Sequence, residues 1–138
     1  MKRYITFASL AFVLLQGSMA QTIIKPSVKT KTTFAIVTDT KSYEEAKKEI
    51  DDYRASVEQE GLGTYLVIND WKTPQPIREV LQKLHEDKKN PLEGCVLVGD
   101  IPIPMIRDAQ HLCSAFKMNQ AMDWQRSSVP SDRYYDDF

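Results

Sequence analysis

The hydrophobic pattern of the chain indicates three strands separated by two helical segments. Residues 32–38 (TTFAIVT) alternate between polar and apolar side chains, which is typical of a strand. Residues 64–69 (TYLVIN) are β-branched or aromatic with little alternation, which favours a strand buried on both faces. Residues 94–98 (GCVLV) are again apolar and predict a third strand.

The segment between the first two strands has the spacing of an amphipathic helix. Ser42 and Glu45 form a Ser-x-x-Glu capping box, in which both side chains bind backbone N–H groups of the first turn. Gly61 and Gly63 supply the left-handed conformation that ends such a helix. Apolar residues recur at steps of three and four and predict one buried face: Tyr43, Ala46, Ile50, Tyr53 and Val57.

A second helix is expected between the second and third strands. Thr73 and Pro74 suit the N-cap and the first turn. His85 comes at the end of the helix among charged residues, and we expect it to be solvated. One face of the helix carries four apolar residues: Ile77, Val80, Leu81 and Leu84.

This order of elements predicts an α/β fold. Strand, helix, strand, helix, strand is typical of a parallel sheet with right-handed crossovers. We therefore predict a Rossmann-like domain over residues 33–138, a βαβαβ unit with a parallel sheet of three or four strands. Pro102 and Pro104 end the strand pattern, since each lacks a backbone donor. Sheets usually have five or six strands, so we expect the domain to be incomplete; a small domain with a frayed tail is the alternative.

The first twenty residues have the three parts of a secretory signal peptide. Lys2 and Arg3 form the positive region, and residues 5–15 (ITFASLAFVLL) form an apolar region that is too short to span a bilayer. Residues 18–20 (SMA) are a small-x-small cleavage site. We therefore predict export, to the medium, the cell surface or the periplasm. The mature chain should begin at residue 21, carry no membrane span and start with a linker or edge segment at residues 21–32.

Composition argues against a nucleic-acid partner. The chain has 18 basic and 19 acidic residues and a net charge of −1, and removal of the signal peptide makes it more acidic. The basic residues are scattered and form no stripe that could follow a phosphate backbone. Cys95 and Cys113 allow one disulfide in an exported chain. The alternative is a buried thiol at Cys95, which lies within an apolar strand pattern.

The sequence contains no motif that assembles a catalytic site. The turn at residues 38–42 is rich in hydroxyl groups but has no glycine, so its backbone is poorly suited to hold a phosphate. His111 and Cys113 are two residues apart, whereas side chains that meet on a helix are three or four apart. We therefore assign no catalytic residue, because nucleophilic catalysis needs a base oriented onto the thiol.

The acidic C-terminal segment is a candidate calcium site. Asp132, Asp136 and Asp137 carry carboxylates, and the carbonyls of Tyr134 and Tyr135 lie between them, which are the hard oxygen ligands that calcium takes. The segment lacks the glycine-bearing loop of dedicated calcium sites. We therefore assign no metal ligand and no cofactor to this chain, and leave calcium open for a full-length protein.

Three motifs in the second half of the chain carry a family resemblance. Residues 95–100 (CVLVGD) form an apolar strand closed by Val-Gly-Asp, and residues 101–104 (IPIP) form a proline-bearing segment. Residues 130–135 (PSDRYY) contain a Ser-Asp-x-x-Tyr element. In this order, and after the strands and helices upstream, the motifs resemble the gingipain-like cysteine peptidases, secreted bacterial enzymes of the caspase-like clan. The resemblance covers residues 33–138.

The resemblance implies a substrate pocket without catalytic residues. The catalytic histidine and cysteine of such enzymes lie further downstream, so none is transferred to this chain. Asp100, Ser131, Asp132 and Tyr134 are the substrate-pocket candidates. Asp132 matches the family's aspartate, and a carboxylate in the pocket would favour a basic side chain of the substrate.

We therefore expect the N-terminal part of an exported gingipain-like cysteine endopeptidase. It would hydrolyse peptide bonds only with a downstream Cys–His pair. Its partners would be the missing C-terminal part of the same protein and a protein or peptide substrate. A stand-alone exported binding module without catalysis is one alternative. A flavodoxin-like ligand-binding domain is another, which the glycine-free first turn disfavours.

Overall fold

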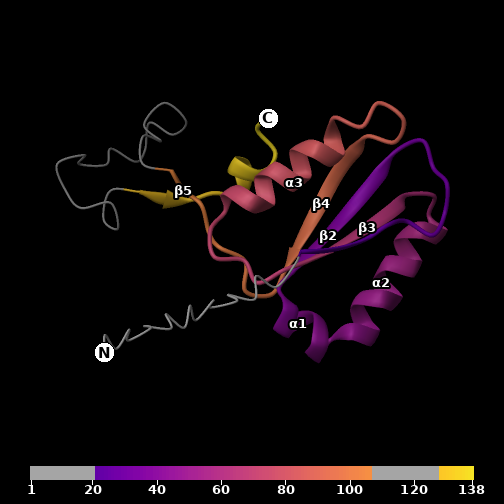
Figure 1. Ribbon diagram of the computed structural model, residues 1–138, viewed down its shortest axis with the longest axis horizontal. Coiled ribbons are helices and arrows are strands. Elements are labelled where there is room, and N and C mark those ends of the chain that lie inside the picture. The colour runs from indigo at the N-terminus through magenta and orange to yellow at the C-terminus, as the bar shows by residue number, and fades with distance from the viewer. Residues whose placement is uncertain (1–20, 107–127) are drawn as a thin grey trace, which may run out of the picture.

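A four-stranded sheet with helices on both faces forms the centre of the protein (Figure 1). The computed structural model describes residues 21–106 and 128–138. The strands of the sheet are β1 (Thr22–Ile24), β2 (Thr33–Thr38), β3 (Gly63–Ile68) and β4 (Leu92–Val98). The helices are α1 (Thr40–Glu45), α2 (Lys47–Gln59) and α3 (Gln75–His85). A two-stranded ribbon, β5 (Met105–Ile106) and β6 (Val129–Pro130), precedes the 3-10 helix η2 (Asp132–Tyr135).

The three predicted strands are confirmed, and they are parallel. The sheet order is β1-β3-β2-β4, with β2 between β3 and β4. The prediction of an entirely parallel sheet was wrong in one respect, because the fourth strand, β1, is antiparallel to β3. Part of residues 21–32, which the sequence analysis treats as a linker or an edge segment, forms β1 at one edge of the sheet. The connection from β1 to β2 is short and contains no crossover helix, so the chain reverses direction between them.

Side chains on the two faces of the sheet build two separate cores. One core joins alternate residues of β2, such as Ala35 and Val37, to α3 and η2. The other core lies on the opposite face, where Ile36 of β2 packs with Ile50 of α2. Both faces of β2 are therefore buried, which explains why the strand is apolar almost throughout. The arrangement confirms an α/β fold with helices on both sides of a largely parallel sheet.

The first predicted helix is two helices, and its cap is a different residue. The chain breaks at Ala46 between α1 and α2, and the N-cap of α1 is Asp39, whose carboxylate accepts a hydrogen bond from the Ser42 backbone N–H at 2.9 Å. The predicted capping box at Ser42 was wrong, because the aspartate three residues earlier satisfies that donor. Gly61 has the predicted positive φ, +96°, whereas Gly63 begins β3.

The second predicted helix is confirmed as α3, with a shifted start. Its N-cap is Pro74 rather than Thr73, and the helix begins at Gln75. Ile77, Val80 and Leu81 are buried as the pattern predicts. His85 is exposed, yet it is more than a solvated terminal residue: its Nδ1 lies 2.9 Å from the Leu92 carbonyl oxygen, and its ring centroid lies 5.5 Å from that of Phe138.

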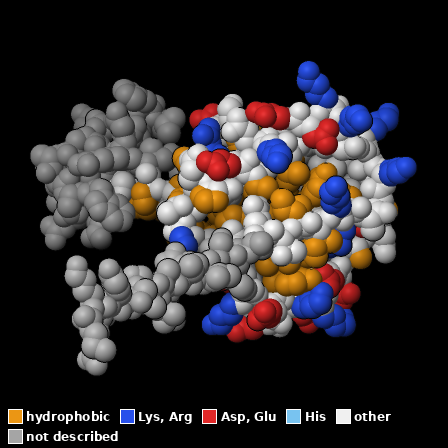
Figure 2. Space-filling view, in the orientation of Figure 1, with side chains coloured by type: hydrophobic (Ala, Val, Ile, Leu, Met, Phe, Trp, Pro, Cys, Tyr) orange, Lys and Arg blue, Asp and Glu red, His pale blue; other side chains and the backbone are white. Residues whose placement is uncertain are grey.

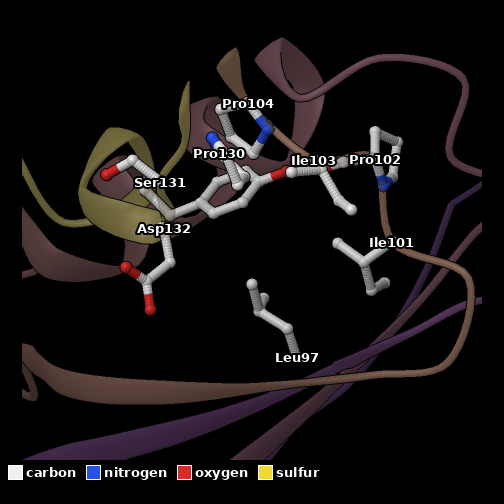
Figure 3. A pocket seen from close by; sticks show the side chains of 9 residues that line it. Leu97, Ile101, Pro102, Ile103, Pro104, Pro130, Ser131 and Asp132 are labelled. Carbon is white, nitrogen blue, oxygen red and sulfur yellow. The ribbon is translucent and has the colours of Figure 1, made fainter. Parts of the chain in front are cut away.

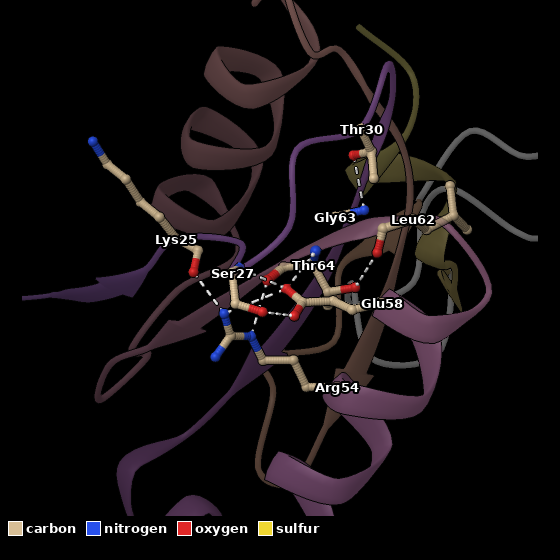
Figure 4. Close-up of polar contacts among 8 residues, drawn as sticks. All are labelled: Lys25, Ser27, Thr30, Arg54, Glu58, Leu62, Gly63 and Thr64. Atoms are coloured by element: carbon tan, nitrogen blue, oxygen red, sulfur yellow. Dashed lines mark hydrogen bonds and ion pairs between the residues drawn. The ribbon is translucent and has the colours of Figure 1, made fainter.

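One buried carboxylate fastens the N-terminal segment to the domain (Figure 4). Glu58, near the end of α2, accepts backbone N–H groups from Ser27 at 3.0 Å and Thr64 at 3.2 Å, and also the Ser27 hydroxyl. Arg54, one turn earlier, lies 3.4 Å from the same carboxylate and donates to the Lys25 and Thr64 carbonyls. The network thus joins the segment after β1 to both α2 and β3.

Candidate functional site

The carboxyl ends of β2 and β4 are held together by Asp39. Its carboxylate accepts hydrogen bonds from the backbone N–H groups of Ser42, at 2.9 Å, and Asp100, at 2.7 Å. Gly99 permits this close approach: its φ is +93°, and a Cβ there would lie 2.0 Å from Asp39 Oδ2. Burial opposes ionisation of Asp39, but the hydrogen bonds from Ser42 and Asp100 outweigh it, so the pKa of Asp39 lies below its usual value.

A polar cleft lies beside this contact. It has a volume of about 380 Å³, and its lining includes Asp100, Asp70 and Lys72 together with the buried Trp71. Ligands of open α/β sheets bind beyond the carboxyl ends of the strands, which is where this cleft lies. Asp100 therefore occupies a position from which it can contact a ligand, but it lines this cleft and not the hollow that contains Ser131.

A second, more apolar hollow lies between β4 and the C-terminal segment (Figure 3). Its volume is about 360 Å³. Leu97 of β4 and the segment Ile101–Pro104 form one side, and Pro130, Ser131 and Asp132 form the other. The Asp132 side chain extends from η2 toward the strand that carries Leu97. The hollow therefore combines an apolar lining with one carboxylate at its margin.

Tyr135 ties the two sides of the hollow together. Its side chain is buried, and its hydroxyl donates a hydrogen bond to the Pro102 carbonyl oxygen. The Ser131 backbone N–H donates to the Pro104 carbonyl oxygen at 3.0 Å, which adds a second connection. Burial raises the pKa of Tyr135 to about 12, so the phenol remains a neutral donor at physiological pH.

The structure brings together only two of the four predicted pocket residues. Ser131 and Asp132 line the hollow. Tyr134 lies against α3 instead, where its hydroxyl donates to Gln75 Oε1 and its ring lies 5.2 Å from the Arg78 guanidinium carbon. Asp100 lies in the polar cleft described above. The four residues therefore do not form one site.

Sequence reasoning missed Tyr135 as a residue of the hollow. A signal was present, because the Ser-Asp-x-x-Tyr spacing that starts at Ser131 ends at Tyr135 and not at Tyr134. Leu97 also lines the hollow. The hydrophobic pattern predicted that Leu97 lies in a strand. No sequence feature indicates which residues of that strand line a hollow at the surface.

The acidic C-terminal segment was the candidate calcium site of the sequence analysis. Among residues 21–106 and 128–138, no group of three or more His, Cys, Asp or Glu side chains is placed to hold a metal ion. Instead, Asp136 lies 3.4 Å from the Arg133 guanidinium in an exposed ion pair.

Cys95 is half-buried in the core beside Tyr135. Burial raises the pKa of its thiol, and the nearby carboxylates of Asp136 and Asp132 raise it further. A thiol in this environment is poorly suited to be a nucleophile, because the reactive form is the thiolate. His111 and Cys113, and with them the predicted disulfide, lie outside the described residues, as does the predicted signal peptide.

Comparison with protein-family models, with curated proteins and with solved structures finds no match for this chain. Within the part of the chain that the structure describes, no helix has both the length and the apolar character that a membrane crossing requires. The view in Figure 2 shows basic and acidic side chains interspersed around the surface, with apolar side chains gathered between them.

Proposed function

We propose that this chain is the N-terminal part of an exported gingipain-like cysteine endopeptidase. Its role would be to supply one wall of the substrate-binding region. The peptide bond would be hydrolysed by a Cys–His pair located downstream of residue 138. The partners are then the C-terminal part of the same protein and a protein or peptide substrate.

The observation that carries this proposal is the hollow between β4 and η2. The three motifs that resemble the family meet there: Leu97 from the apolar strand, Ile101–Pro104 from the proline-bearing segment, and Ser131 with Asp132 from the Ser-Asp element. The first two segments are contiguous in the sequence, whereas Pro130 lies 26 residues after Pro104, and two hydrogen bonds hold the distant segment beside the proline-bearing one. A concave, mostly apolar hollow with a few polar groups is typical of a binding pocket.

The chemistry of the hollow favours a basic side chain of the substrate. Its apolar lining can cover the methylene groups of an Arg or Lys side chain, and the Asp132 carboxylate can accept charge-assisted hydrogen bonds from the cationic end. Burial raises the pKa of the Cys95 thiol, which makes Cys95 a poor nucleophile and agrees with a nucleophile supplied from downstream. The downstream histidine would act as the base that activates the downstream cysteine.

A peptidase assay on the product of the complete reading frame tests the proposal. The product should cleave peptides after Arg or Lys, and Asp132→Asn should lower kcat/KM for these peptides about tenfold relative to a neutral substrate. Asp137→Asn is the matched control, because Asp137 is equally a carboxylate of the C-terminal segment and does not line the hollow. The 138-residue chain alone should show no activity.

Two results would overturn this function. One is peptide cleavage by the 138-residue chain alone, which would show that the reactive groups are within it. The other is a reading frame that ends at the Phe138 codon, because the Cys–His pair would then have no source. Such a frame would favour the second candidate, a stand-alone exported binding module.

The second candidate is favoured by the two cores on opposite faces of the sheet. A domain that buries apolar side chains on both faces has the means to fold without further chain. If the chain is a binding module, it should unfold cooperatively in urea and remain monomeric by sedimentation. An aggregated or molten product would count against this candidate.

A further inference from the structure

A separate hollow lies at the amino end of the sheet, toward the edge that carries β1. β1 ends at Ile24, which pairs with Leu66, so within the described residues the first part of β3 has no strand beside it on that side. The chain after Ile24 instead turns over the start of β3, where the Gly63 backbone N–H donates a hydrogen bond to Thr30 Oγ1 at 2.9 Å. The space between this segment and the start of the sheet, the amino-end hollow, has a volume of about 320 Å³.

Hydrogen bonds hold the walls of the amino-end hollow in place. The Asn90 side-chain amide donates to the Thr30 carbonyl oxygen, and the Thr33 backbone N–H donates to the Pro91 carbonyl oxygen at 2.9 Å. A site that is formed before its ligand arrives is typical of small-molecule binding. The walls do not depend on chain beyond residue 138, because further strands beside β4 would extend the sheet away from β1.

The polar groups that line the hollow include donors without partners. Lys25, Lys29 and Tyr65 belong to the lining. No hydrogen bond or ion pair joins the two ammonium groups or the Tyr65 hydroxyl to any residue that the structure describes. In Figure 4 the Lys25 side chain extends away from Arg54, although its carbonyl oxygen accepts a hydrogen bond from that residue. The described lining contains no Asp or Glu, so an anionic group would meet donors and no charge of its own sign.

The surface around the hollow is also basic. Residues 25–32 (KPSVKTKT), which form the connection from β1 to β2, carry three lysines and no acidic residue. Figure 2 shows several basic side chains on the side of the molecule where Figure 1 shows this connection and the one from α3 to β4. The lysines are scattered in the sequence, and only the turn over the start of β3 brings two of them beside Tyr65. A locally positive surface attracts anions to a site.

We propose that the amino-end hollow binds a small molecule through an anionic oxygen group, a phosphate, sulfate or carboxylate, held by Lys25, Lys29 and the Tyr65 hydroxyl. Charge-assisted hydrogen bonds from the ammonium groups supply most of the affinity, and the phenol fixes the orientation of the anion. Pro26 and Val28 form an apolar part of the lining and cover a ring or chain of the ligand. Such a site would serve equally in a peptidase and in a stand-alone binding module.

The probes are phenyl phosphate, phenyl sulfate and benzoate, each titrated into the purified ¹⁵N-labelled protein at low salt. Binding should shift the backbone amide signals of Lys29, Thr30 and Tyr65 and leave that of Asp100, at the opposite end of the sheet, unchanged. The probe that binds most tightly identifies the anionic group. Benzyl alcohol is the uncharged control and should bind about tenfold more weakly, because it offers no charge to the ammonium groups. Added salt should weaken binding of the anions and not of benzyl alcohol.

Substitutions of the lining test the assignment of the donors. Lys25→Gln and Lys29→Gln should each weaken binding of phenyl phosphate about three- to tenfold, because each removes a charge-assisted donor from an exposed side chain. Lys31→Gln is the matched control, since it removes the same charge from the same segment outside the lining, and it should change the affinity less than about twofold. Tyr65→Phe should weaken binding about threefold, whereas Tyr53→Phe, in the exposed part of α2, should have no effect. Urea unfolding of each variant checks that the fold is retained.

Three outcomes would overturn the proposal. Equal weakening by Lys29→Gln and Lys31→Gln would show that the anion responds to diffuse surface charge and not to a site. Equal binding of benzyl alcohol and phenyl phosphate would show that the anionic group is not recognised. Unchanged amide signals of Lys29, Thr30 and Tyr65 at the highest soluble concentration of all three probes would show that the hollow binds no small anion.

Discussion

Replacement of Glu58 should detach the N-terminal segment from the domain and lower stability in a pH-dependent way. Glu58→Gln keeps the shape of the side chain and removes its charge. In the native protein this carboxylate contacts Arg54 and accepts hydrogen bonds from Ser27 and Thr64, so it joins α2, β3 and the segment after β1 (Figure 4).

The expected loss is about 2 kcal/mol at pH 7. Hydrogen bonds to a charged group contribute about 1.5–3 kcal/mol, and a glutamine oxygen retains part of this as a neutral acceptor. The pair is not a surface ion pair of negligible worth, because the side chain of Glu58 is only 7% exposed and that of Arg54 only 17%. Removal of the charge also leaves the Arg54 guanidinium without its anion in a partly buried position.

The pH dependence follows from the direction of the pKa shift. Burial of Glu58 opposes ionisation, but the hydrogen bonds from Ser27 and Thr64 and the charge of Arg54 outweigh it, so the pKa lies below the ordinary value of 4.5. A lowered native pKa stabilises the fold above the unfolded pKa, and this stabilisation is lost as the pH falls through the native pKa. The wild type should therefore approach the variant below about pH 4.5.

The assay is urea unfolding followed by far-UV circular dichroism at several pH values between 3 and 7, analysed as free energies of unfolding. Glu60→Gln is the matched control, since Glu60 lies two residues away and is exposed. The reasoning is refuted if Glu58→Gln and Glu60→Gln unfold with the same free energy at pH 7. It is also refuted if the difference between wild type and Glu58→Gln persists unchanged at pH 3.

Three further predictions concern the other end of the sheet and the N-terminus. Gly99→Ala should destabilise the fold by about 2–4 kcal/mol in urea unfolding, because Gly99 has a positive φ and a Cβ there would clash with Asp39. Gly61→Ala should cost only about 1 kcal/mol, because Gly61 has a positive φ but open space around it. Equal losses of stability in the two variants would contradict the clash. Tyr135→Phe should lower the free energy of unfolding by about 1 kcal/mol in the same assay, because it removes the hydrogen bond to Pro102. Ultraviolet titration of the wild type should show one phenol that ionises near pH 12 and is absent from the variant. An unchanged titration would contradict the assignment of this ionisation to Tyr135. Mass spectrometry of the exported protein should show a chain that begins at Gln21, and an intact N-terminus would contradict the signal peptide.

Sequence reasoning predicted well those elements whose pattern of apolar and polar side chains depends only on neighbouring residues. The three parallel strands and α3 begin within two residues of their predicted starts, because their apolar runs are bounded by turn residues that act on their immediate neighbours. The break between α1 and α2 was missed. An apolar stripe from Tyr43 to Ile50 is compatible with one helix, and only the packing of Ala46 and its neighbours on the sheet shows the interruption.

The candidate site was less accessible to sequence reasoning. Ser131 and Asp132 were predicted by resemblance, and they lie in the hollow. Tyr134 was chosen over Tyr135, although two adjacent tyrosines must point in different directions and only one could face the hollow. The segments that form its two sides come together through contacts of Tyr135 and Ser131 with prolines about thirty residues earlier, which no local pattern records.

The sequence by itself determined that the domain is α/β, with the strand at residues 64–69 buried on both faces and amphipathic helical segments between the strands, because hydrophobic periodicity depends only on neighbouring residues. Tertiary structure alone decided the antiparallel direction of β1, the Asp39 contact that joins β2 to β4, and the hollow at the amino end of the sheet. Each of these depends on which distant backbone groups meet, and the chain must fold before their hydrogen bonds exist.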